Sequence, residues 1–409
     1  MQTQLADFIR DTPAGREADA ILRACVHCGF CNATCPTYLL SGDELDGPRG
    51  RIYQIKQLLE GQVATGHTQL HLDRCLTCRN CETTCPSGVR YAQLLDIGRE
   101  ILAEQQPRPP GSRFLRWLLH QGLSRNRVFT PLLRLGQLTR PLLPSRLKAK
   151  IPLRVDPGRW PERPSSRKML ILEGCVQPAM TPETNAATAR VLDRLGIQLL
   201  RPAGAGCCGA LVHHLDATEA AKRLMRRNID AWWPAMEQGA EAIVVTASGC
   251  GVMIKDYGRL LAADPAYATK ARRVSALTRD LSEILAREDL SDLATQPACR
   301  VAFHPPCSLQ HGQQLKGMVE AILRRLGHEL VEVRESHLCC GSAGVYSILQ
   351  GPISQRLLEQ KLAALQAGEP EMILTANIGC QAHLATRAGV PVRHWISLLD
   401  PESTPSMAR

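Results

Sequence analysis

Two copies of one cysteine pattern place the strongest constraint on this chain. The first copy contains Cys25, Cys28, Cys31 and Cys35, the second contains Cys75, Cys78, Cys81 and Cys85, and a proline follows each copy. Both read C-x2-C-x2-C-x3-C-P, a spacing in which three thiolates hold one 4Fe-4S cluster and the fourth reaches the other cluster. We therefore predict two 4Fe-4S clusters, one held by Cys25, Cys28, Cys31 and Cys85 and the other by Cys75, Cys78, Cys81 and Cys35.

Zinc binding and disulfide formation are the alternative roles for these cysteines. A four-cysteine zinc site usually takes two separated C-x2-C pairs, whereas here a third cysteine follows at once and a proline closes each run. Disulfides need an oxidising compartment, and the first ten residues carry Asp7 and lack the apolar run of a signal peptide. The pattern therefore favours iron-sulfur clusters in a reducing environment.

Residues 1–106 are predicted to form an all-helical cluster domain. Apolar residues recur at helical spacing from 52 to 60 and from about 89 to 104, and no alternating β pattern occurs. Arg49 and Arg51 lie between the cysteine runs, where positive charge would stabilise reduced clusters by Coulomb attraction. The alternative is that these arginines are solvated or pair with the nearby acidic residues Asp43, Glu44 and Asp46.

Residues 107–168 form a basic, proline-rich segment. They contain 15 Lys and Arg but only two acidic residues, so this segment accounts for the chain's net charge of +10. Its ten prolines predict short, broken pieces. Leucines and aromatic residues alternate with arginines, as in segments that lie on an anionic membrane surface. The arginines are Arg113, Arg116, Arg125, Arg127, Arg134 and Arg140.

Two further roles are open to the basic segment, which could contact a protein partner or act as a plain linker. Nucleic acid binding is disfavoured, because no recognition helix or base-stacking motif accompanies the charge.

From residue 169 onward the chain contains an internal duplication. Each copy has a lone cysteine, a Cys-Cys-Gly triplet and a final Gly-Cys pair. The lone cysteine and the triplet lie 32 residues apart in both copies, and the last cysteine follows the triplet's second cysteine by 42 and 40 residues. Such matched spacing indicates repeated structural units. We assign residues 169–296 to the first repeat, 297–400 to the second and 401–409 to a tail.

Each repeat is predicted to fold as βαβ units. An apolar strand leads to the lone cysteine, a helix closed by Leu-Gly follows, and a later apolar strand leads to the final cysteine. This alternation predicts a parallel sheet with cysteines beyond the carboxyl ends of its strands, where open α/β sheets bind ligands. The fold class is therefore α plus α/β: an all-helical ferredoxin domain with two 4Fe-4S clusters, then a duplicated Cys-Cys-Gly domain.

The four cysteines of each repeat are expected to converge on one site. They are Cys175, Cys207, Cys208 and Cys250 in the first repeat, and Cys307, Cys339, Cys340 and Cys380 in the second. Convergent thiols can hold a further iron-sulfur cluster, act as a redox dithiol, or pack as small apolar residues. Cys299 has no counterpart and is interpreted as a core residue. His304 and His337 are interpreted as polar residues beside the second site.

The two ferredoxin runs, the stretch Asp-Gly-Pro-Arg-Gly-Arg-Ile at 46–52 and the two repeats resemble the family of glycolate oxidase iron-sulfur subunits. The wider family includes heterodisulfide reductase subunits and the iron-sulfur subunits of anaerobic glycerol-3-phosphate dehydrogenase and lactate oxidation systems. The resemblance implies a subunit that relays electrons toward a membrane quinone. The electrons would come from partner flavoproteins, which carry the FAD and oxidise glycolate or another 2-hydroxy acid.

One departure from the wider family bears on the chemistry. Heterodisulfide reductase relatives carry a fifth cysteine where this chain has Met253 and His383, which disfavours catalysis on a heterodisulfide. His383 is interpreted as a solvated helix histidine, with a nitrogen ligand as the alternative.

Other function classes are disfavoured by missing motifs. The sequence contains no dinucleotide fingerprint, P-loop or nucleophile elbow, so we expect no flavin or nucleotide site in this chain. The alternatives to a glycolate oxidase relay are a lactate or glycerol-3-phosphate dehydrogenase subunit, an enzyme acting at a Cys-Cys-Gly site, and a zinc scaffold. No apolar run reaches the roughly 18 residues of a membrane span. We expect a peripheral protein on the cytoplasmic side of the inner membrane, or otherwise a cytoplasmic one.

Overall fold

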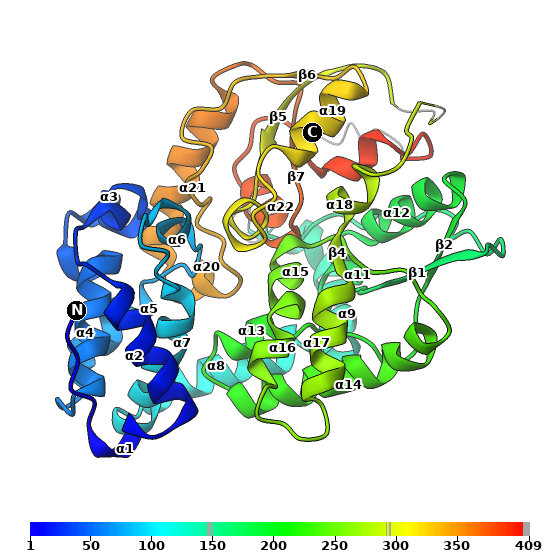
Figure 1. Cartoon of the computed structure of the whole chain (residues 1–409). Coiled ribbons are helices and arrows are strands. Elements are labelled where there is room, and N and C mark those ends of the chain that lie inside the picture. The colour runs from blue at the N-terminus through cyan, green and yellow to red at the C-terminus, as the bar shows by residue number, and fades with distance from the viewer. Residues whose placement is uncertain (145–147, 149, 292, 294–295, 404–409) are drawn as a thin grey trace. The chain divides into compact units, whose positions relative to one another are not determined.

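The amino-terminal cysteine runs lie in a unit built from helices (Figure 1). The computed structural model describes residues 1–144, 148, 150–291, 293 and 296–403, so most of the predicted tail lies outside the described residues. One compact unit, the helical unit, comprises Met1–Arg116 and His337–Lys361. The other, the sheet unit, comprises Trp117–Ser336 and Leu362–Arg409.

Residues 1–106 contain helices and no strand, which confirms the all-helical prediction for this part of the chain. The elements are α1 (Asp7–Arg10), α2 (Pro13–Ala24), η1 (Phe30–Thr34), α3 (Pro36–Ser41), η2 (Glu44–Asp46), α4 (Pro48–Leu59), α5 (Gly66–Asp73), α6 (Asn80–Thr84) and α7 (Tyr91–Gln105). α4 begins four residues before the predicted start because Pro48 occupies its first turn, where proline needs no hydrogen-bond partner. α20 (Tyr346–Leu349) also belongs to this unit.

The core of the helical unit forms where α2, α4 and α7 pack together. Ile21 and Leu22 of α2, Ile55 of α4, and Leu94 and Leu95 of α7 are at most 2% exposed. Burying each of these side chains contributes about 1.5–3 kcal/mol. This apolar core supports the loops that carry the cysteines.

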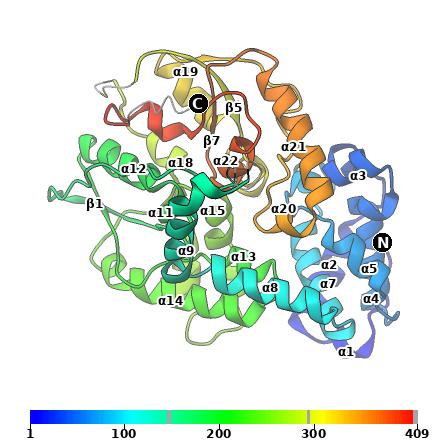
Figure 2. The same ribbon diagram turned by 180° about the vertical axis from the view of Figure 1, so that it is seen from behind.

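The sheet unit contains two four-stranded sheets of the same design (Figures 1 and 2). The first has the order β2-β1-β3-β4 and the second β6-β5-β7-β8, and every described pairing is parallel. The strands are β1 (Arg167–Ile171), β2 (Ile197–Leu200), β3 (Ile243–Val245), β4 (Thr278–Asp280), β5 (Arg300–His304), β6 (Glu329–Leu330), β7 (Met372–Thr375) and β8 (Val392–His394). The duplicated parallel sheet is confirmed.

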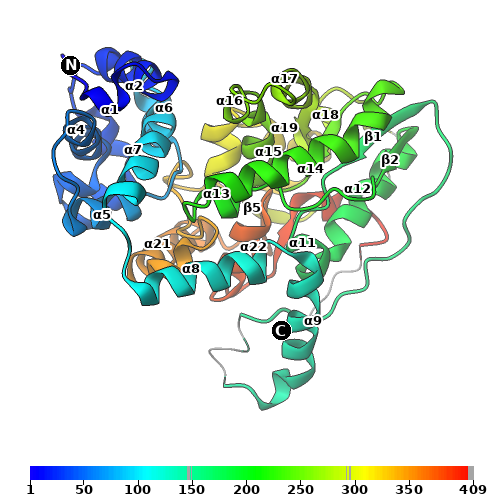
Figure 3. The ribbon, with the colours of Figure 1, turned by 90° about the horizontal axis from the view of Figure 1, so that it is seen from below.

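Helices cover both faces of the first sheet. Met169 and Ile171 of β1 pack into a core that also includes residues of α12 and of the second sheet. Leu170, between them, points to the opposite face and packs with residues of α14. Helices α12 and α14 therefore lie on opposite faces of the sheet, on either side of β1 in Figure 1; Figure 3 views both helices from below.

The remaining described elements of the chain connect these strands or precede them. They are α8 (Pro110–Leu123), α9 (Asn126–Thr139), η3 (Arg140–Leu142), α11 (Gln177–Met180), α12 (Pro182–Arg194), α13 (Ala210–His213), α14 (Thr218–Glu237), α15 (Ser248–Lys255), α16 (Tyr257–Leu260), α17 (Ala268–Leu277), α18 (Leu281–Leu285), η4 (Ser308–Gly312), α19 (Met318–Arg325), α21 (Gly351–Gln366), α22 (Ile378–Ala385) and η5 (Trp395–Leu398). The division between the units falls within α8 and within α21.

Candidate iron-sulfur and thiol centres

The first set of predicted ligands surrounds one cavity in the helical unit. The cavity has an empty volume of about 440 Å³, part of it open to solvent, and its lining includes Cys25, Cys28, Cys31, Cys81 and Cys85. Burial raises the pKa of Cys25, and raises that of Cys31 to about 11, with neighbouring thiols adding to the effect at Cys31. These thiols fit a bound iron-sulfur cluster, because iron binds the thiolate and offsets the charge that burial disfavours.

The second set of predicted ligands combines Cys35, the last cysteine of the first run, with three cysteines of the second run. Burial raises the pKa of Cys81, and the charges of Cys78, Cys75 and Cys35 raise it further. The Thr77 N–H and the Tyr91 hydroxyl donate to Cys75 Sγ, at 3.4 and 3.6 Å. Donors to a ligand sulfur tune the potential of an iron-sulfur cluster. This set too fits a 4Fe-4S cluster.

The two cysteine runs adopt the same backbone conformation. The residues on either side of the second cysteine have left-handed backbones in both runs. They are His27 and Gly29 around Cys28, at φ 58° and 89°, and Thr77 and Arg79 around Cys78, at φ 53° and 59°. A positive φ is unusual for any residue but glycine, and each such residue costs of order 1–3 kcal/mol. The shared conformation indicates that both loops are shaped by the same requirement, which is to turn three thiols toward one point.

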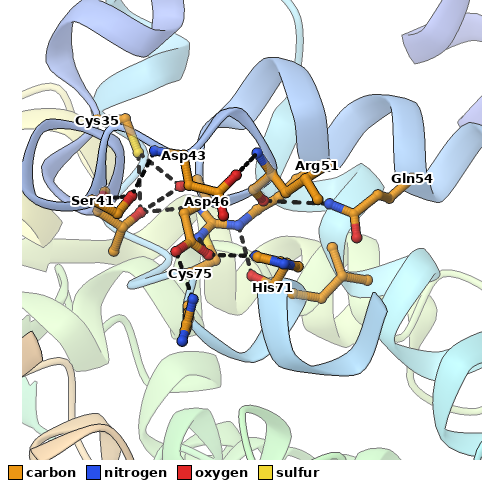
Figure 4. A network of polar contacts seen from close by, with 12 residues as sticks. Cys35, Ser41, Asp43, Asp46, Arg51, Gln54, His71 and Cys75 are labelled. Carbon is orange, nitrogen blue, oxygen red and sulfur yellow. Dashed lines mark hydrogen bonds and ion pairs between the residues drawn. The ribbon is translucent and has the colours of Figure 1, made fainter. Parts of the chain in front are cut away.

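A buried polar network lies next to the second set (Figure 4). Asp46 is 2% exposed, and its carboxylate contacts His71 Nδ1 at 2.7 Å and Arg74 Nη1 at 2.8 Å. Arg51 is 1% exposed and lies 3.6 Å from the same carboxylate. Arg49, by contrast, is partly exposed and pairs with Glu44, Nε to Oε1 at 2.6 Å. The two arginines, which look equivalent in the sequence, therefore have different surroundings.

The first repeat brings its four cysteines together in the sheet unit. Cys175 follows β1, Cys207 and Cys208 follow β2, and Cys250 is the third residue of α15, just after β3. Thiol hydrogen bonds connect Cys175 to Cys207, Cys207 to Cys208, and Cys208 to Cys250. The cysteines thus lie at the carboxyl edge of the sheet, where its strand order reverses and ligands usually bind.

Cys207 differs from its neighbours in this thiol set because its pKa is lowered, whereas the pKa values of Cys175 and Cys208 are raised. The Cys175 and Cys208 thiols hydrogen bond with Cys207 and hold the pKa of Cys207 well below its usual range, with a smaller contribution from Arg227. The Gly209 N–H also donates to Cys207 Sγ, at 3.4 Å. Gly209 has φ 93°, so glycine supplies the tight turn after the cysteine pair. A cysteine with a lowered pKa and two thiol neighbours is suited to metal binding or to redox chemistry.

A small cavity adjoins two of these thiols. It has an empty volume of about 300 Å³ and is lined by Cys175, Cys250 and mainly apolar residues. The apolar residues are Leu172, Val176, Val245, Ala247 and Ile378.

The second repeat has the same local geometry around its Cys-Cys-Gly triplet. Cys339 and Cys340 are buried in the helical unit, and the Gly341 N–H donates to Cys339 Sγ at 3.4 Å. Gly341 has φ 87°, close to that of Gly209. Cys307 and Cys380 belong to the sheet unit, with Cys380 the third residue of α22, as Cys250 is of α15. Convergence of these four cysteines stays a prediction.

Known proteins share both halves of this architecture. Residues 21–89 match a 4Fe-4S dicluster domain, and residues 169–255 and 301–385 match a cysteine-rich domain. The chain is 56% identical over 401 residues to the glycolate oxidase iron-sulfur subunit of Escherichia coli (strain K12), which covers 98% of both chains. It belongs to this family of iron-sulfur subunits.

More distant relatives agree with this membership. The probable glycolate oxidase iron-sulfur subunit of Bacillus subtilis (strain 168) is 32% identical over 387 residues, covering 87% of this chain and 86% of the relative. Lactate utilization protein A of Geobacillus kaustophilus is 30% identical over 239 residues, covering 55% of this chain and 95% of the relative. The resemblance inferred from the cysteine motifs is confirmed, and iron-sulfur clusters fit the matched domains.

One histidine of this family member is more buried than its sequence suggests. His383 was expected to be solvated on a helix, but it is 8% exposed in α22. Its counterpart in the first repeat, Met253 in α15, is 5% exposed. Both positions are one turn beyond the last cysteine on a helix that packs beside its sheet, so burial is a property of the repeat and the solvated interpretation was wrong.

The structure also describes the surroundings of Cys299, His304 and His337. Cys299 is half-buried just before β5 and packs against the core of the sheet unit, as expected of a core residue. His304 is the last residue of β5 and is 1% exposed. The His337 carbonyl accepts a hydrogen bond from Asn80 Nδ2 at 3.2 Å within the helical unit. A role for either histidine beside a thiol site remains a prediction.

The basic segment forms longer helices than its prolines suggested. α8 and α9 each have 14 residues, with Pro110 beginning α8 and Pro131 inside α9. A proline at the start of a helix loses no hydrogen bond, so it does not break the element. Arg108 and Arg116 pair with Asp73 within the helical unit. No helix of the described residues is long and apolar enough to cross a membrane.

The same helices expose apolar side chains. No residue of α9 is buried, and Leu132, Leu135 and Leu138 are 59%, 58% and 79% exposed. Phe114, Trp117 and Leu118 of α8 are 51–63% exposed. Arg113, Arg125, Arg127 and Arg134 are also exposed, whereas Arg140 Nε donates to the Ile151 carbonyl.

Proposed function

We propose that this chain is the electron-transfer subunit of a glycolate (2-hydroxy acid) oxidase complex. It takes electrons from flavoprotein subunits that hold the FAD and passes them toward a membrane quinone. The observation that supports this proposal is that thiols from both cysteine runs lie together in the helical unit: Cys85 lines one cavity with Cys25, Cys28 and Cys31, and Cys35 lies near Cys81 with Cys75 and Cys78. The full-length similarity to glycolate oxidase iron-sulfur subunits supports the same role.

We assign the ligand sets from the thiols that lie together. Cys25, Cys28, Cys31 and Cys85 would hold one cluster, and Cys75, Cys78, Cys81 and Cys35 the other. Bound there, 4Fe-4S clusters exchange single electrons, which suits a flavin that releases two. The chain's own contribution is to hold the thiolates, exclude water from the buried ones and place donors such as Tyr91 near their sulfurs.

A second function is considered because the first repeat has its own thiol site. Cys175, Cys207, Cys208 and Cys250 would hold a further cluster or serve as a redox site beside the 300 Å³ cavity. Catalysis on a heterodisulfide is less well supported, because Met253 and His383 replace the fifth cysteine of those relatives. A lactate or glycerol-3-phosphate dehydrogenase would use the same relay with different flavoprotein partners.

Adding the purified chain back to its partners tests the relay. Partner flavoproteins alone should be reduced by glycolate but should pass few electrons to a quinone analogue, and the added chain should restore that transfer. Quinone reduction by the flavoproteins alone, unchanged on adding the chain, would contradict the proposal. Replacing glycolate by lactate or glycerol 3-phosphate in the same assay tests the alternatives.

We also propose that α8 and α9 attach this subunit to an anionic membrane surface. Their exposed leucines and aromatic residues would enter the lipid interface while the arginines contact the headgroups. Attached in this way, the subunit would be a peripheral protein on the cytoplasmic side of the inner membrane. Arg116 is excluded from the contact, since it pairs with Asp73.

Replacing Arg113, Arg125, Arg127 and Arg134 by Gln should weaken vesicle binding. At about 1 kcal/mol for each arginine, the partition coefficient onto vesicles with phosphatidylglycerol should fall by about three orders of magnitude at low salt. Co-sedimentation measures it. A matched variant that loses the exposed Arg90, Arg272, Arg287 and Arg324 should bind nearly as the wild type does. If the first variant keeps vesicle binding but loses its partner subunits, the segment is a protein interface instead.

A further inference from the structure

Arg51 is a buried cation with unused hydrogen-bonding capacity. Its Nε donates to the His71 carbonyl at 2.8 Å and its Nη1 to Thr37 Oγ1 at 3.2 Å. Its Nη2 is buried and has no hydrogen-bond acceptor within reach in the described part of the chain. The nearest carboxylate oxygen, on Asp46, is 3.6 Å away, which is too far for a hydrogen bond. Buried polar groups are usually paired, and this nitrogen is available to an acceptor outside the polypeptide.

The Asp46 carboxylate beside Arg51 also binds His71 and Arg74. Asp46 Oδ1 contacts His71 Nδ1 at 2.7 Å, and Asp46 Oδ2 accepts from Arg74 Nη1 at 2.8 Å (Figure 4). One buried carboxylate therefore faces two arginines, while the carboxylate of Asp43, which lies within 4.8 Å of Asp46 and His71, belongs to an exposed residue. Both Asp46 and Arg51 are at most 2% exposed, so water screens their charges poorly.

The buried Arg51 guanidinium lies among ligands of the second set. Burial by itself lowers the pKa of Arg51, but the charges of Cys75, Tyr91, Cys35 and Asp46 together outweigh that effect and raise it. Thr37 connects the two sites directly, because its Oγ1 lies 3.3 Å from Cys35 Sγ and accepts from Arg51. Figure 4 shows Arg51 and Asp46 in the same polar network as Cys35 and Cys75.

We infer that Arg51 is the residue that raises the reduction potential of the cluster held by Cys75, Cys78, Cys81 and Cys35. The inference rests on the proposed function, since it assumes a cluster in that set. Reduction adds one electron, so the site becomes more negative by one charge, and a nearby fixed cation stabilises that reduced form. The unpaired Nη2 supplies a donor for a cluster sulfur, a second means of raising the potential.

Arg49 provides a matched control on the same helix. It lines the cavity of the first set, but its Nε and Nη2 donate to Glu44 at 2.6 and 3.1 Å. Its side chain is 35% exposed, so its charge is both neutralised and screened. Loss of Arg49 should therefore change either potential much less than loss of Arg51.

The test is a potentiometric titration monitored by EPR on the anaerobically purified chain, with dithionite as reductant. Arg51→Gln should shift the reduction equilibrium of the second cluster at least tenfold toward the oxidised form, which is about 59 mV for one electron. The first cluster should change less than threefold. Arg51→Lys, which keeps the charge, should recover most of the shift, and Arg49→Gln should leave the second cluster within threefold of the wild type.

Several outcomes decide the inference. Two loaded clusters in Arg51→Gln with unchanged potentials would overturn it. If that variant does not load the second cluster, Asp46→Asn is titrated instead, and removing the negative charge should shift the second cluster toward the reduced form. A shift in the other direction, or none, overturns the inference equally. Wild-type protein without iron would instead overturn the proposed function, so the two failures are distinguishable.

Discussion

Cys85→Ala should remove the same cluster as Cys28→Ala, although these residues lie in different cysteine runs. Both thiols line the cavity of the first set, and alanine leaves no donor to replace them. Each variant should lose about four of the roughly eight irons that two 4Fe-4S clusters contain, and the EPR signal that remains should be the same in both. Cys35→Ala should in turn match Cys78→Ala, because Cys35 lies with the second run.

A cysteine outside the sets serves as the control for these variants. Cys299→Ala removes a half-buried thiol of the sheet unit and should keep the iron content of the wild type. If Cys85→Ala lost the same signal as Cys78→Ala, each run would hold its own cluster and the crossed assignment would be wrong.

Cys28→Ser or Cys78→Ser should stop electron flow through the assembled complex. Replacing groups that only support a metal ligand typically costs 10–100-fold in activity, so losing a ligand should lower quinone reduction at least 100-fold. The partner flavin should still be reduced by glycolate at the wild-type rate, because that step does not use this chain. Stopped-flow absorbance of the flavin and steady-state quinone reduction measure the two steps separately.

Complex assembly must be checked in the same variants. Co-purification of the partner subunits at the wild-type ratio shows that the loss lies in electron transfer. Full quinone turnover by both variants would mean that electrons bypass this subunit.

The duplicated sheets could be predicted because their signals are local. Apolar runs that end near Cys175 and Cys307, and equal steps to the two triplets, describe strands and turns that fold alike in each copy. The two sheets have the same strand order because the same local signals occur in both copies. The spacing C-x2-C-x2-C-x3-C-P likewise predicts the crossed ligand sets, and that assignment stays a prediction.

Features that depend on packing between distant segments could not be predicted. Asp46 and His71 are 25 residues apart, and neither belongs to a motif that pairs them. Arg116 appeared to be one of several basic surface residues until Asp73, 43 residues earlier, proved to be its partner. His383 is polar in a helix, and only the packing of that helix beside its sheet determines that it is buried.

Iron and acid-labile sulfide, measured together with low-temperature EPR on the anaerobically purified chain, test the central claim most directly. We expect at least about eight of each per chain, as two 4Fe-4S clusters require, and a coupled signal on reduction. Zinc in place of iron, or a colourless protein without an EPR signal on reduction, would contradict it.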